Sequence, residues 1–147
     1  MQEKINHLLS GQRIKRLYEE LLKPVMKHHS LTKNEVDILL FLHNNPGYDT
    51  ARDIVDVRGL SKSHVCQSIE VLVKRRYLAT RQDEKDRRCI HLILQRESDP
   101  AVADALKAQN RLWELLFKRF SPEETRLLES AFEKMYENVQ EALAHGI

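Results

Sequence analysis

Polar side chains gather near the start of one predicted helix whose other face is apolar. Val65, Ile69 and Leu72 fall at the spacing of a buried helical stripe, so the helix should pack through that side. The other side carries hydroxyl, imidazole and amide groups, which can hydrogen-bond to base edges in the major groove of DNA. The candidate base-contacting residues are Ser63, His64, Gln67 and Ser68. This face predicts a helix that reads duplex DNA.

The start of the same helix suits a phosphate group. Ser61 is the expected N-cap, and a helix N-terminus offers free amides to an anion. Lys62 and Lys74 are candidates for phosphate contact. Gln67 is the most specific of the base-contacting candidates, because its amide can bond adenine through two atoms and discriminate by about 1–3 kcal/mol. The alternative interpretation is an ordinary solvated helix face, and the basic segment that follows favours DNA reading over it.

A basic hairpin is expected directly after this helix. Residues 77–82 and 89–94 are its expected strands, and residues 83–88 form a charged tip. A basic hairpin beside a reading helix suits the DNA backbone or the minor groove. Its candidate DNA-contacting residues are Arg81, Lys85, Asp86, Arg87 and Arg88.

Two residues of the hairpin are expected to act together. Asp86 and Arg88 lie two positions apart, on one side of an extended strand, so the carboxylate could order the guanidinium before DNA arrives. Arg87 would point the other way, towards phosphate. The alternative is a surface ion pair, worth only about 0–1 kcal/mol.

Charge is distributed unevenly along the 147 residues. From Leu60 to Arg96, nine Lys and Arg stand against four acids, a net charge of +5; from Glu97 to the end, six stand against ten, a net charge of −4. Positive charge is therefore concentrated where phosphate contact would need it, although the whole chain carries only +2.

Composition narrows the class of protein. A hydrophobic content of 41% and a charged content of 31% suit a soluble, helix-rich chain. Charges interrupt every apolar run and the first residues are polar, so we expect no membrane span, no secretory signal and a cytoplasmic location. The sequence has no Gly-x-Ser-x-Gly string and no glycine-rich phosphate loop, so an enzyme is not expected.

The cysteines and histidines give no metal-ligand spacing, so neither a metal site nor a cofactor is expected. Cys66 is interpreted as a small core residue and Cys89 as a strand residue; a redox switch is the less favoured alternative, because no second cysteine is placed to resolve a sulfenate. His28 and His29 are adjacent, so in a helix they should point in different directions.

Start and stop signals divide the chain into elements. The spacing of Leu8 and Leu17 fits a first helix, which Pro24 should kink. Capping residues then predict helices after Thr32 and Thr50. Gly59 supplies the turn before the reading helix, and two helices follow the hairpin, the first running from about Ser98 to Phe120 and the last beginning at Ser121.

The resulting fold is mainly α with a small β-hairpin wing: a winged helix-turn-helix with N- and C-terminal dimerisation helices. Residues 1–30 and 98–147 are expected to form a helical dimerisation lobe, and residues 31–97 a winged-helix DNA-binding lobe. Among the residues expected at the dimer interface are Leu8, Leu17, Leu128, Phe132 and Met135.

This order of elements resembles the MarR family of bacterial transcriptional regulators. The strings that carry the resemblance are Leu31-Thr32, Leu60-Ser61-Lys62-Ser63 and Asp86-Arg87-Arg88. The resemblance implies an obligate homodimer with interlocked terminal helices, whose DNA affinity small ligands or oxidants tune. It also implies that Arg88 of the Asp-x-Arg wing motif enters the minor groove while Asp86 braces it.

The sequence departs from the family pattern at two places. Arg76 stands where the family usually has glycine, which predicts a non-glycine residue at a strained helix end. The string Leu94-Gln95-Arg96-Glu97 lacks the family's usual Leu-Thr and following Gly, so the start of the next helix could differ.

Taken together, these patterns predict a homodimeric regulator, expected to be a repressor, that binds a pseudo-palindrome in double-stranded DNA. A small-molecule effector could bind where the first, second and Trp113-containing helices meet. The alternative function is a winged helix that contacts only other proteins.

Overall fold

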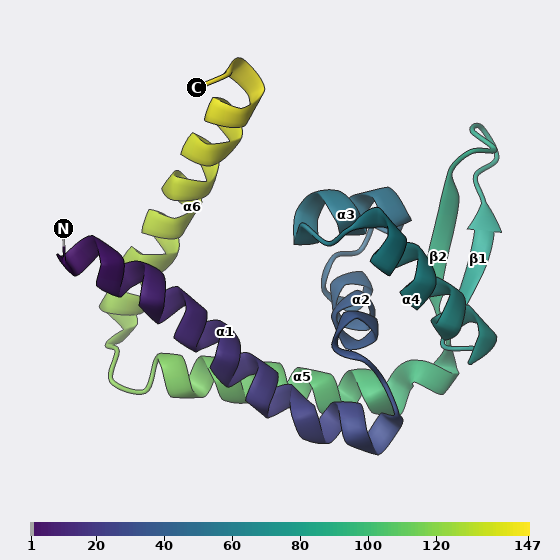
Figure 1. The fold of residues 1–147 in the computed structure, drawn as a ribbon, viewed down its shortest axis with the longest axis horizontal. Helices are drawn as coiled ribbons and strands as arrows, with labels where there is room; N and C mark the ends of the chain where they lie inside the picture. The colour runs from purple at the N-terminus through teal and green to yellow at the C-terminus, as the bar shows by residue number, and fades with distance from the viewer. Residues whose placement is uncertain (1) are drawn as a thin grey trace. The chain divides into compact units, whose positions relative to one another are not determined.

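The computed structural model describes the backbone of residues 2–147 and the side chains of residues 11–147. It divides into two compact units, residues 1–112 and 113–147. The elements are α1 (Gln2–His29), α2 (Lys33–Asn44), α3 (Ala51–Arg58), α4 (Lys62–Lys74), β1 (Leu78–Gln82), β2 (Ile90–Leu94), the 3₁₀ turn η1 (Arg96–Ser98), α5 (Asp99–Leu116) and α6 (Pro122–His145). The mainly helical fold with one small antiparallel hairpin confirms the expected class (Figure 1).

The predicted helix starts are confirmed by their hydrogen bonds. Thr32 and Glu35 form a capping box at α2, and Thr50 and Asp53 form another at α3. Ser121 and Glu124 form a third at α6. Each box satisfies free amides of the first helical turn from the chain's own side chains, which sets where the helix begins.

The joints around α4 use two left-handed residues. Gly59 ends α3 with a φ of 64°, as its type allows without strain. Arg76 follows α4 with a φ of 60°, so the strained non-glycine position expected there is confirmed. A side chain in this conformation costs roughly 1–2 kcal/mol, which the packing around it must offset.

Helix α2 lies at the centre of the core of residues 1–112. It is buried from Glu35 to Leu42 and contacts α1, α4 and β2. Ile54 of α3, Leu72 of α4 and Leu78 of β1 complete the interior, each at most 2% exposed. Helix α4 and strand β2 thus pack directly on α2, and α3 packs on α4 (Figure 1).

Two predicted boundaries need correction. Helix α5 ends at Leu116 rather than Phe120, because the chain turns through a Phe120 N–H bond to the Phe117 carbonyl and must become extended at the Ser121 cap. The hairpin strands each begin one residue later than expected. Pro24 lies inside α1, which continues past it.

Among the described residues, no helix is both long and apolar enough to cross a membrane.

Candidate nucleic-acid interface

The N-terminal end of α4 presents its predicted polar residues to solvent. Ser61 caps the helix by accepting a hydrogen bond from the His64 N–H at 3.3 Å. Lys62, Ser63, His64 and Gln67 are all exposed. The first turn of α4 therefore offers side-chain donors and acceptors together with helix amides, as groove and phosphate recognition require.

Two residues of α4 lie on the opposite side from the one expected. Ser68 is only 8% exposed, because it falls three positions after Val65 and four before Leu72 on the buried stripe. It cannot reach a base edge in this conformation, so its assignment to DNA contact is corrected. Cys66, expected in the core, is exposed because it lies one position past that stripe. Lys74 is exposed and pairs with Glu70 at 3.7 Å.

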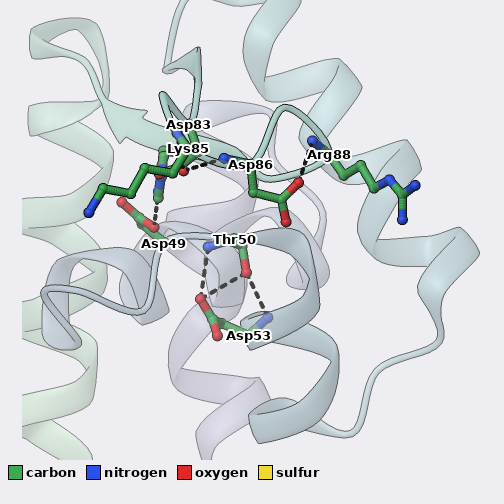
Figure 2. A network of polar contacts seen from close by, with 8 residues as sticks. Asp49, Thr50, Asp53, Asp83, Lys85, Asp86 and Arg88 are labelled. Atoms are coloured by element: carbon green, nitrogen blue, oxygen red, sulfur yellow. Dashed lines mark hydrogen bonds and ion pairs between the residues drawn. The ribbon is translucent and has the colours of Figure 1, made fainter.

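The wing tip is built by carboxylates that accept backbone hydrogen bonds. Asp83 accepts from the N–H groups of Lys85 and Asp86, at 3.0 and 2.9 Å. Asp86 accepts from the N–H of Arg88 at 3.0 Å. The Arg88 side chain extends away from the Asp86 carboxylate (Figure 2). Asp86 therefore orders the backbone that carries Arg88, which corrects the expectation that its carboxylate would order the guanidinium.

The extended geometry expected for this tip is also wrong. Arg87 and Arg88 lie in a turn, closed by a 2.9 Å hydrogen bond from the Cys89 N–H to the Asp86 carbonyl. Gln82 donates its side-chain amide to the Arg87 carbonyl at 2.8 Å. The side chains that the turn and β1 present to solvent are Arg81, Lys85, Asp86, Arg87 and Arg88.

A groove lies between the start of α4 and the wing. Its walls include Lys62 at the start of α4, Arg52 of α3 and Arg88 of the wing. Residues far apart in the sequence thus bring three cations to one concave surface of the unit formed by residues 1–112. Such a basic groove suits a polyanion.

The fold agrees with that of known proteins. A model of the MarR family matches residues 29–88, which span α2, α3, α4 and the wing. The solved MarR protein from Peptoclostridium difficile is 24% identical, with a TM-score of 0.76 and coverage of 92% of this chain and 88% of that one. Residues 29–88 are therefore similar to the MarR family, and the chain shares the fold of that MarR protein over 92% of its length.

Two further solved structures share the fold at lower identity. Bordetella bronchiseptica BpsR is 22% identical, with a TM-score of 0.67 and coverage of 90% and 98% of the two chains. S. aureus MepR, solved with DNA, is 14% identical, with a TM-score of 0.69 and coverage of 95% and 96%. No curated protein sequence matches the chain.

The wing of this chain is held to the segment before α3 by a histidine that sequence reasoning missed. His91 of β2 contacts Asp49, before α3, through Nδ1 at 2.7 Å and Asp83 through Nε2 at 2.8 Å. The Leu92 N–H also bonds the Asp49 carbonyl at 2.7 Å. A protonated imidazole can donate to both carboxylates at once, whereas a neutral one can donate to only one. The sequence gives little indication of this contact, because Asp49 and His91 are 42 residues apart.

These contacts shift the pKa values of His91 and Asp83. Hydrogen bonds to Asp49 and then Asp83 raise the pKa of His91, against burial and the positive charge of Arg81. The hydrogen bond from His91, followed by the backbone bonds from Asp86 and Lys85, lowers the pKa of Asp83 to about 2. We call the contacts of protonated His91 with charged Asp49 and Asp83 the charged bridge. It contributes its full stability above the unfolded pKa of aspartate and below that of histidine, roughly pH 4–6.5.

We expect the wing to loosen as the pH rises through the raised pKa of His91, because the bridge then loses one donor. NMR titration of the His91 ring should give a pKa above 6.5. Asp49→Asn should lower that value more than Asp83→Asn does. Asp86→Asn serves as the control, since Asp86 accepts from Arg88 instead of the ring. A His91 pKa that neither Asp49→Asn nor Asp83→Asn lowers would contradict the bridge.

A second missed residue ties α4 to the joint between α1 and α2. Arg75, counted in the sequence only as one more basic residue, donates to the carbonyls of Ser30 and His29 at 2.8 and 2.7 Å. Its guanidinium also lies 4.5 Å from the centre of the Tyr77 ring. The Arg75 side chain thus contacts other parts of the protein, and it links the C-terminal end of α4 to the end of α1.

Proposed function

We propose that this chain is a homodimeric transcriptional regulator, expected to act as a repressor, that binds a pseudo-palindromic DNA operator. The observation that carries the proposal is the gathering of exposed polar and basic residues on the first turn of α4 and the wing. The residues proposed to contact DNA are Ser61, Lys62, Ser63, His64, Gln67, Lys74, Arg81, Lys85, Arg87 and Arg88, with Asp86 shaping the wing.

In this proposal α4 enters the major groove by its N-terminal end, and the wing meets the adjacent backbone and minor groove. Two copies would place their reading helices one turn of DNA apart, about 34–36 Å. The similar fold of S. aureus MepR, which was solved with DNA, supports this docking mode.

Dimerisation is proposed through the lobe formed by residues 1–30 and 98–147. Helix α6 supports it, because none of its residues is buried and all but one of its large exposed apolar side chains, Leu127, follow one helical stripe. Exposed fractions range from 54% to 72% for Leu127, Phe132, Met135, Tyr136, Val139 and Leu143. A stripe of this size marks an interface, and a second copy is the occupant that a two-fold operator requires. Leu17 and Leu128 are half-buried, and the side chain of Leu8 lies outside the described residues.

We propose that a small molecule, in preference to an oxidant, releases the protein from its DNA operator. A groove between α1 and α5 is lined by Leu21, Val25 and Lys107 among others. In BpsR, a protein of similar fold, DNA binding is regulated by the small molecule 6-hydroxynicotinic acid. Burial, followed by nearby aspartates, raises the pKa of the Cys89 thiol, which disfavours the reactive thiolate. A cytoplasmic location remains part of the proposal.

The decisive experiment compares wild-type protein with Arg88→Ala on an operator selected from random duplexes. We expect the substitution to weaken binding by about 1–3 kcal/mol and to reduce the salt slope of the affinity by about one. The reason is that an exposed wing guanidinium is lost while the tip turn, held by Asp83 and Asp86, stays intact. Fluorescence anisotropy over a salt series provides the measurement.

Lys134→Ala is the matched control, since Lys134 is an exposed cation on α6. It should leave both the affinity and the salt slope unchanged. If selection yields no duplex and the protein elutes from heparin at low salt, the protein-contact function replaces the DNA-binding one. Equal affinities and equal salt slopes for Arg88→Ala and wild type would show that Arg88 of the wing does not contact DNA.

A further inference from the structure

We propose that His28, His29 and Asp104 form a binding site for one divalent transition-metal ion of the Zn²⁺ class. One ligand-capable atom from each side chain lies within 4.8 Å of the other two. His29 Nε2 and Asp104 Oδ2 are 2.7 Å apart. Two imidazoles and a carboxylate form a ligand set that zinc commonly takes in proteins.

The arrangement overturns the expectation that the adjacent imidazoles diverge. Their ring centres are 4.7 Å apart with the planes at 88°, so two side chains of the last turn of α1 reach the same region. Asp104 comes from α5, 75 residues beyond His29, so no ligand spacing in the sequence could reveal the cluster.

The distances suit a site that closes around an ion. Zinc bonds of about 2.0–2.2 Å place neighbouring ligand atoms about 3.4 Å apart in a tetrahedral site. His29 and Asp104 would separate slightly from their present hydrogen bond, and His28 would move inwards by side-chain rotation. Three protein ligands leave a fourth position for water, as in open zinc sites.

The site is open to an ion from solvent, through a groove whose other charged lining residues are Lys27, Lys107 and Arg111. The His29 side chain is 9% exposed and that of Asp104 is 40% exposed, so one ligand is anchored and another is reachable. The C-terminal end of α1 adds the negative end of a helix dipole. His28 and Asp104 both line the groove between α1 and α5, which gives the ion a path from solvent. A simple ion pair would need only His29 and Asp104, whereas the third ligand points to an ion.

The site is connected to the reading helix through the main chain. Arg75, at the end of α4, donates to the carbonyl of His29 itself at 2.7 Å. An ion that fixes His29 therefore also fixes an anchor of α4. This consequence, a change of DNA affinity on metal binding, rests on the proposed function, while the metal site does not.

The first test titrates Zn²⁺ into the full chain in competition with a chromophoric chelator. We expect one ion per chain, with affinity reduced by more than the roughly 10–100-fold typical of residues that only support a ligand, in both His28→Ala and Asp104→Asn. His43→Ala is the matched control, because His43 is an exposed histidine outside the cluster. A Cys66→Ser/Cys89→Ser double variant should bind like wild type. Equal affinity in His28→Ala, Asp104→Asn and wild type, or no binding of one equivalent by wild type, overturns the site.

The second test measures duplex affinity without zinc and with saturating zinc. Wild type should shift by about fivefold or more, and His28→Ala should not shift. An unchanged wild-type affinity would overturn the connection through Arg75 and leave DNA binding intact. Failure to bind any duplex under either condition would overturn the proposed function, while the zinc titration alone would still decide the metal site.

Discussion

Phe132→Glu is expected to convert the protein from a dimer to a monomer and to weaken its binding to a two-half-site duplex by about 10²–10⁴-fold. Phe132 is 57% exposed on the apolar stripe of α6, with Met135 one turn further along at 58%. A carboxylate in the middle of that stripe would have to be buried unpaired in the dimer, which is strongly unfavourable. The loss in DNA affinity follows because each half-site would then have to bind independently.

Sedimentation velocity and anisotropy on the same samples provide the measurement. Wild type should sediment as twice the chain mass of 17.3 kDa. Lys134→Gln is the matched control, since it also changes the charge of α6 by one unit while staying off the apolar stripe. A wild-type protein that is monomeric at micromolar concentration would contradict the dimer. A dimeric Phe132→Glu protein would place the interface elsewhere.

Local signals in the sequence predicted the helix starts. The capping pair Thr32 and Glu35 is formed within one helical turn, so both partners can be recognised from spacing alone. The strained joint at Arg76 was predicted in another way, from the resemblance to the MarR family, which usually has glycine at that position. Spacing succeeds for the helix caps because their partners are close together in the chain.

Contacts between distant segments could not be predicted in this way. The bridge from His91 to Asp49 and the contact of His29 with Asp104 join residues 42 and 75 positions apart. Ser68 shows a subtler limit. Its helical phase lies at the border between the two faces of α4, and only the packing of that helix against α2 and α3 makes it buried. Helical periodicity gives the direction of a face but not its width.

A buried carboxylate on α2 illustrates how such a long-range contact controls stability. Asp37 is 2% exposed, and its Oδ1 lies 3.1 Å from Nη2 of Arg58 at the end of α3. Its Oδ2 lies 3.5 Å from Nζ of Lys33. Within the described residues, Asp37 Oδ1 has no hydrogen bond of good geometry. The carboxylate therefore depends on charge attraction to compensate for its lost hydration.

Arg58→Ala should lower the free energy of unfolding by about 3 kcal/mol, because it leaves the buried charge of Asp37 with only the more distant lysine. Asp37→Leu should cost less, since Arg58 and Lys33 are 40% and 32% exposed and can turn to solvent. The double variant should recover most of the loss. Urea unfolding of the three variants measures these differences.

Arg52→Ala is the matched control, since Arg52 lies on the same helix but is 90% exposed and pairs with Asp56 at 3.7 Å. A surface pair of this kind contributes about 0–1 kcal/mol. If Asp37→Leu proved more destabilising than Arg58→Ala, the ion pair would be a net source of stability, and desolvation of Asp37 would not be the dominant effect. If Arg58→Ala cost no more than Arg52→Ala, the remaining lysine would suffice to hold the carboxylate.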